Sequence, residues 1–133
     1  MLVNRLGGYI NFTYRSLKSA RDGRQLEQRL DATESVPWLL DVMFALVGRV
    51  RPYNKYLPWE LREHPLNAPE WAASRFLPLL DSLITDGHDD TLRRIYAVVE
   101  RECRGHDLIH GTCLGAEIND WGDNLRLLRS DRS

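Results

Sequence analysis

The sequence has little cysteine, no long apolar run and almost no net charge, and each shortage argues against a class of protein. The chain has two cysteines, Cys103 and Cys113, and residues 1–10 lack the apolar core of a signal peptide. Both observations predict a reduced, cytoplasmic protein. The longest apolar run, Val42–Val47, is far shorter than the ~20 residues that span a bilayer, so no membrane partner is expected. A net charge of −1 gives no overall electrostatic field that would attract nucleic acid. We therefore do not expect nucleic acid as a partner.

The sequence also lacks sustained alternation of apolar and polar residues, so no sheet is expected. Its 133 residues, 43% of them hydrophobic, suit one domain with a real core. We therefore predict an all-α fold, a single up-and-down helical bundle of four to five main helices. The helical domain is expected over residues 1–128, with a disordered tail over 129–133.

The stretch Val36–Leu61 organises the chain. Its first half is almost wholly apolar and predicts a central helix that other elements surround. Its second half, Arg49–Leu61, mixes cations, aromatic residues and two prolines. This composition predicts a structured Pro/aromatic connection after the second helix.

Apolar spacing and turn residues predict where the helices begin and end. The expected helices cover residues 9–22, 24–48, 59–64, 70–85, 89–104 and 120–128. Gly7 and Gly8 are placed before the first helix, and Leu26 and Leu30 are placed in the core stripe of the second. Pro37 predicts one kinked second helix, and the alternative is two helices with Ser35 as the second N-cap. Asp89 or Asp90 is expected to cap the helix over 89–104.

A set of acids shares one face of the second predicted helix. Its members are Glu27, Asp31, Glu34 and Asp41, with Trp38 filling the gap in the spacing. Asp41 has apolar neighbours, so its carboxylate must be paired or have a raised pKa. One interpretation is ion pairing with Arg15 and Lys18 of the first helix. The other is a cation-binding face on which Glu34 acts as general base.

Cations alternate with aromatic rings in the connection, at Arg49, Arg51, Tyr53, Lys55, Tyr56, Trp59 and Arg62. Such a set can clamp phosphate and stack a base. The alternative is a loop that its rings pin to the core, with the cations extending to solvent.

Two patterns near the C-terminus have a chemical interpretation. The spacing of Cys103, His106, His110 and Cys113 invites a zinc site. On one helix, however, the cysteines would lie ~15 Å apart, so we predict no metal site. Arg101 and His106 match the Arg-x4-6-His signature of helical ribonuclease domains known as HEPN, in which two such pairs at a dimer interface could stabilise a phosphoryl-transfer transition state.

Four stretches carry a family resemblance: YRSLK (14–18), ATES (32–35), MFALVGRVRPYNKYLPWEL (43–61) and HPL (64–66). In them the chain resembles the C-terminal helical domain of bacterial nucleotidyltransferase-like proteins. That domain is related to the helical half of kanamycin nucleotidyltransferase and, more distantly, to HEPN domains. The resemblance covers residues 9–66 well, and beyond Pro69 it depends on helix order.

The resemblance implies a substrate-recognition helical domain that is not catalytic alone. The family's catalytic half carries Gly-Ser and Asp-x-Asp, and neither motif occurs in this chain. Magnesium and a nucleoside triphosphate are therefore implied only with a partner catalytic domain, and the expected ligand is a small-molecule substrate. By position, Glu34 and Asp41 are the implied cleft carboxylates, and the other candidate binding residues are Arg15, Lys18, Tyr53 and Lys55. The alternatives are an HEPN-type ribonuclease or toxin-like module using Arg101 and His106, and a helical interaction module that forms a homodimer.

Overall fold

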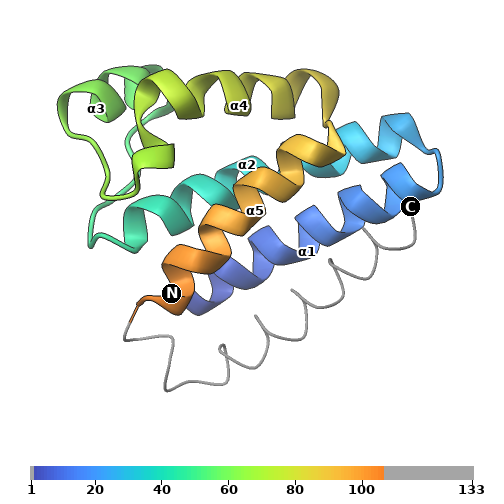
Figure 1. Ribbon diagram of the computed structural model, residues 1–133, viewed down its shortest axis with the longest axis horizontal. Helices are drawn as coiled ribbons and strands as arrows, with labels where there is room; N and C mark the ends of the chain where they lie inside the picture. Colours follow the sequence, from blue (N-terminus) through green and yellow to red (C-terminus); the bar gives the residue numbers. More distant parts are fainter. Residues whose placement is uncertain (1, 107–133) are drawn as a thin grey trace.

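The computed structural model describes residues 2–106 and confirms the predicted all-α class (Figure 1). Within these residues the α-helices are α1 (Leu2–Arg21), α2 (Gln25–Ala45), α3 (Leu57–Glu63), α4 (Ala73–Asp86) and α5 (Asp89–Arg104). Two short 3-10 helices, η1 (Asn54–Tyr56) and η2 (Pro69–Trp71), precede α3 and α4. This part of the chain contains no strand, and none of its helices is both long and apolar enough to cross a bilayer. The helix predicted over 120–128 and the tail over 129–133 lie outside the described residues.

The four long helices form a bundle whose main contacts follow the order α1, α2, α4, α5 and back to α1 (Figure 1). The short helix α3 packs against α4. The large side chains that fill the centre are almost fully buried and come from all four long helices: Tyr9, Leu17, Leu39, Phe44, Phe76, Leu83 and Ile95. The predicted central helix, α2, contributes to this core along most of its length.

Helix α1 begins at Leu2, earlier than predicted, and it includes Gly7 and Gly8. Trp38 of α2 covers Gly8 so closely that a Cβ there would lie 2.4 Å from the indole Cδ2. Each glycine costs a helix about 1 kcal/mol relative to alanine. At Gly8 the absent side chain makes room for a large aromatic ring, and its packing offsets that cost.

Helix α2 is a single helix with Pro37 inside it, as favoured from the sequence. The proline has no N–H to donate to the carbonyl oxygen of Thr33, which is an exposed residue. Water can take the place of the missing donor there, so the helix continues. It ends at Ala45, before the predicted end at Gly48.

The predicted core stripe of α2 is wrong in its first half. Leu26 is 59% exposed and Leu30 is 56% exposed, whereas Ala32 and Ser35 are buried. The apolar half of the helix from Val36 onward decides which face turns inward. The first turns follow this rotation, which brings small residues against neighbouring backbone and leaves both leucines outside.

The turn before α5 differs from its predicted form. His88, and not Asp89 or Asp90, is the N-cap, and its Nδ1 accepts a hydrogen bond from the backbone N–H of Asp90 at 3.2 Å. Gly87 has φ +58, and a Cβ there would lie 3.0 Å from the Cα of Arg29. The left-handed conformation and the close approach both favour glycine at this turn.

The predicted helix over 70–85 is divided. Residues Pro69–Trp71 form the 3-10 helix η2, and α4 begins at Ala73, after Ala72 adopts an extended ψ of 141. Pro78 lies inside α4.

Candidate functional site

The α1–α2 contact sets the register of the candidate site. Trp38 covers Gly8 in this antiparallel pair. Arg5 precedes Gly8 by three residues on α1, and Asp41 follows Trp38 by three residues on α2. Both residues line the same pocket. The position of Trp38 against Gly8 therefore brings a guanidinium and a carboxylate to one end of the helix pair.

An acidic surface lies along α2 on the other side of Trp38. Glu27 and Glu34 are exposed, and Asp31 is half-buried between them. Desolvation by burial raises the pKa of Asp31, and the charges of Glu34 and Glu27 raise it further, while Arg15 of α1 opposes them. The carboxylates therefore repel one another, and a cationic ligand would relieve this repulsion.

Arg51 fastens the connection after α2 to that helix. Its Nη1 donates to the carbonyl oxygen of Pro37 at 3.3 Å, and its Nη2 donates to Oδ1 of Asn54 at 2.8 Å. The guanidinium also lies 3.9 Å from Oδ1 of Asp41. The Asp41 side chain is 34% exposed, so the ion pair reaches solvent. Arg51 thus holds the loop in place and leaves Asp41 open to a ligand.

A pocket of about 350 Å³ lies where the connection meets the two helices. Its lining residues are Arg5, Asp41, Val50, Arg51, Pro52, Tyr53 and Asn54. Tyr53 is 83% exposed at the rim, so its phenol ring is free to cover a bound molecule. Two guanidinium groups, a carboxylate and a phenol hydroxyl suit a small polar ligand that carries charges of both signs.

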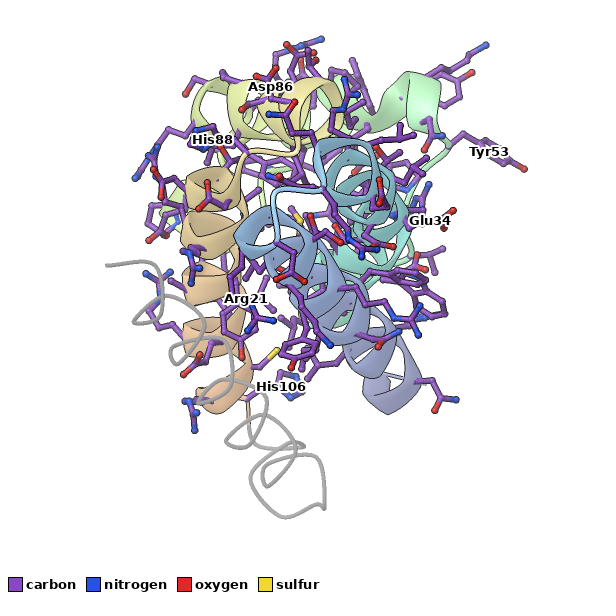
Figure 2. All side chains as sticks on the ribbon, turned by 90° about the vertical axis from the view of Figure 1, so that its right-hand side faces the viewer. Arg21, Glu34, Tyr53, Asp86, His88 and His106 are labelled. Atoms are coloured by element: carbon purple, nitrogen blue, oxygen red, sulfur yellow. The ribbon has the colours of Figure 1, made fainter. Side chains whose placement is uncertain are left out.

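The structure brings Asp41 and Tyr53 together at this pocket, and Figure 2 shows Glu34 and Tyr53 on one side of the molecule. Arg15 and Lys18 are exposed on α1, away from the pocket lining. The Nζ of Lys55 lies 5.1 Å from the centre of its neighbour's ring, that of Tyr56.

Sequence reasoning missed Arg5, because residues 2–8 were placed before the first helix. Continuing the helical spacing back from Ile10 would have placed Arg5 on α1.

The connection is pinned by a cation, and not by its rings as one interpretation proposed. Tyr53, Tyr56 and Trp59 are between 47% and 83% exposed. Arg49 instead donates to Oε2 of Glu60 at 2.6 Å and to the carbonyl oxygen of His64 at 2.8 Å. Its guanidinium also lies 5.2 Å from the centre of the Phe44 ring. The rings are therefore available for contacts with a ligand or a partner.

The alternative pair, Arg101 and His106, is placed differently. Arg101 donates two hydrogen bonds to the carboxylate of Glu70, at 2.6 and 2.8 Å. These bonds raise the pKa of Arg101 and lower the pKa of Glu70 to about 2. His106 lines a separate cavity of about 180 Å³ with Trp71, and Arg101 does not line it. Phosphate stabilisation by Arg101 would require the Glu70 pair to open.

Of the four residues whose spacing suggested a zinc site, the structure describes only Cys103 and His106. Cys103 is buried, and desolvation by burial raises the pKa of its thiol to about 12. His110 and Cys113 lie outside the described residues. Among residues 2–106, no three potential metal-binding side chains come together.

Comparisons with family models, with curated proteins and with solved structures gave no match. The resemblance to nucleotidyltransferase-like helical domains therefore remains a hypothesis that depends on the motifs quoted from residues 14–66.

Proposed function

We propose that the chain is the cytoplasmic substrate-recognition helical domain of a nucleotidyltransferase-like protein, and that it is not catalytic alone. The observation that carries the proposal is the open pocket at the α1–α2 contact, which joins Asp41 and Tyr53 with Arg5 and Arg51. These side chains come from two helices and from the connection that carries the RPYNKY motif.

The residues divide the work of binding between two regions. The surface formed by Glu27, Asp31 and Glu34 favours the amino groups of a cationic small molecule. Burial, and after it the charges of Glu34 and Glu27, raise the pKa of Asp31, and a positive charge there would stabilise its carboxylate. Arg5 and Arg51 favour an anionic or hydroxyl-rich part of the same ligand. The protein's contribution is to hold and orient the ligand.

Phosphoryl transfer would be supplied by a separate catalytic domain with magnesium and a nucleoside triphosphate. The described residues do not bring together ligands that would fit a metal.

A titration tests the proposal. The ¹⁵N-labelled chain is titrated with a panel of aminoglycosides, and amide shifts are expected around Asp41 and Glu34. Asp41→Asn and Glu34→Gln should each weaken binding roughly threefold to tenfold, as expected for exposed charge pairs. Glu63→Gln, which removes an exposed carboxylate of α3, serves as the matched control. Equal affinity of all variants would overturn the proposal.

An activity assay tests the second half of the proposal. With magnesium, a triphosphate and the same panel, the isolated chain should release no pyrophosphate. Turnover that a point mutation within this chain abolishes would refute a purely recognising role.

The exposed leucines of α2 favour self-association as a second candidate function. Leu26 and Leu30 lie one turn apart and are both more than half exposed. Such side chains tend to find another apolar surface. We expect a homodimer in sedimentation at tens of micromolar, and Leu26→Gln with Leu30→Gln should shift it to the monomer. A wild-type monomer at that concentration would contradict the expectation.

A further inference from the structure

A second groove lies on a different face of the bundle, between the first half of α4 and the middle of α5. It has a volume of about 550 Å³ and shares no residue with the pocket at the α1–α2 contact. Its lining residues are Glu70, Trp71, Ser74, Arg75, Pro78, Leu79, Arg94, Ile95, Ala97 and Val98. We call it the α4–α5 groove.

A side-chain contact lies at each end of the groove: one joins α4 to α5, and the other joins η2 to α5. Near the turn, the hydroxyl oxygens of Ser82 and Thr91 lie 3.2 Å apart. At the far end, Arg101 donates to both carboxylate oxygens of Glu70. These two contacts bound the groove at its ends.

The floor of the groove is apolar, and its α5 edge carries a small side chain. Trp71 and Ile95 are 3% and 1% exposed and form the base, with Leu79 and Val98 half-buried beside them. Ala97 on the α5 edge is small and exposed, so the backbone of a third helix can approach closely.

Pro78 also affects the α4 edge. It has no N–H to donate to the carbonyl oxygen of Ser74, one turn earlier, and both residues line the groove. That carbonyl oxygen is therefore an available acceptor for a partner.

The charge of the groove is positive. Arg75 projects from α4 and Arg94 from α5, and both are exposed. The charge of Arg75 also acts on the nearby carboxylate of Glu70, whose pKa it helps to lower. Glu70 is the one carboxylate among the lining residues, and Arg101 occupies both of its oxygens. The edges thus present two exposed guanidinium groups above an apolar floor.

We propose that the α4–α5 groove binds an acidic amphipathic helix of a partner protein. Apolar side chains of the partner at i, i+3 or i+4, and i+7 pack on the floor, and carboxylates on its two flanks pair with Arg75 and Arg94. A second copy of this chain fits poorly, because a two-fold contact through the groove brings the arginines of both copies together. The proposal is independent of the proposed function, since it concerns other residues.

Two synthetic peptides test the proposal. Each is an amphipathic helix of about 15 residues with leucines at helical spacing, and its flanks carry glutamate in one peptide and lysine in the other. The ¹⁵N-labelled chain is titrated with each. The glutamate peptide should shift the amides of Ser74, Leu79, Ala97 and Val98 and bind at least tenfold more tightly than the lysine peptide.

Charge reversal sharpens the test. Arg75→Glu with Arg94→Glu should exchange the preference of the groove for the two peptides. The matched control, Lys18→Glu with Arg62→Glu, changes two exposed cations outside the groove and should retain the wild-type preference. Circular dichroism checks that each variant is folded. If the charge-reversed variant is unfolded, the double variant Arg75→Ala with Arg94→Ala is used in its place.

Several results would overturn the proposal. One is equal binding of both peptides, and another is a preference that neither the reversal nor the alanine pair alters. A third uses decanoate, a small molecule with an apolar chain and one negative charge, as a separate probe. If decanoate shifts the same amides and neither peptide does, the groove is a small-molecule site. Shifts that grow with protein concentration alone would identify a second copy as the occupant.

Discussion

The indole of Trp38 covers Gly8, at a distance that leaves no room for even a methyl group on the glycine. This contact determines how α1 and α2 align, and through that alignment it brings Arg5 to Asp41. A glycine inside a helix thus has a positioning role for the candidate site.

Gly8→Ala tests this contact. The new Cβ would overlap the Trp38 ring, so we expect a loss of roughly 1–3 kcal/mol in the free energy of unfolding. Gly7→Ala is the matched control, because a Cβ at Gly7 meets no atom within 4 Å. It should gain about 0.5–1 kcal/mol from helix propensity. Urea denaturation of both variants gives the comparison, and equal effects would contradict the role of Gly8.

Core substitutions test which face of α2 is buried. Leu40 and Phe44 are 3% and 0% exposed, so replacing either with alanine should cost roughly 2–5 kcal/mol in unfolding free energy. Leu30 is 56% exposed on the same helix, and Leu30→Ala should cost under about 0.5 kcal/mol. Denaturant melts measure all three. A large loss for Leu30→Ala in the monomer would show that the helix is rotated differently.

Neither Asp41 nor Glu34 of α2 is expected to contribute much to the stability of the fold. Asp41 forms a long and partly exposed ion pair with Arg51, so Asp41→Asn should cost under about 1 kcal/mol. Glu34→Gln should leave stability unchanged or raise it, because it removes a charge that raises the pKa of Asp31. Thermal melts of the two variants measure this. A large loss of stability in both would end the ligand-binding proposal for this surface.

The Glu70–Arg101 pair predicts a pH dependence. Hydrogen bonds from Arg101 are the main cause that lowers the pKa of Glu70 from 4.5 to about 2 in the folded chain. The carboxylate therefore stabilises the fold above pH 4.5, and this contribution is lost as the pH falls towards 2. Urea midpoints across this range should fall less steeply for Glu70→Gln than for the wild type. Glu63→Gln should keep the wild-type slope, and an unchanged slope for Glu70→Gln would contradict the prediction.

The sequence by itself determined the helices and the chain's most apolar segment. Apolar spacing predicted α2, α4 and α5 to within a few residues, and α2 continues through Pro37 as favoured. These features depend on residues about one helical turn apart, so a linear pattern contains them. The spacing also predicted that Glu27, Asp31 and Glu34 share a side of α2, and the charges of Glu34 and Glu27 do act on Asp31.

Only the tertiary structure decided what those faces meet. Arg51, and not Arg15 or Lys18, is the partner of Asp41, because the connection after α2 folds back along the helix. Leu30 is exposed because the more apolar half of α2 sets the rotation of the whole helix. Gly8 lies inside a helix, where its missing side chain leaves room for the ring of Trp38. Each of these depends on packing between residues far apart in the chain, which no local pattern records.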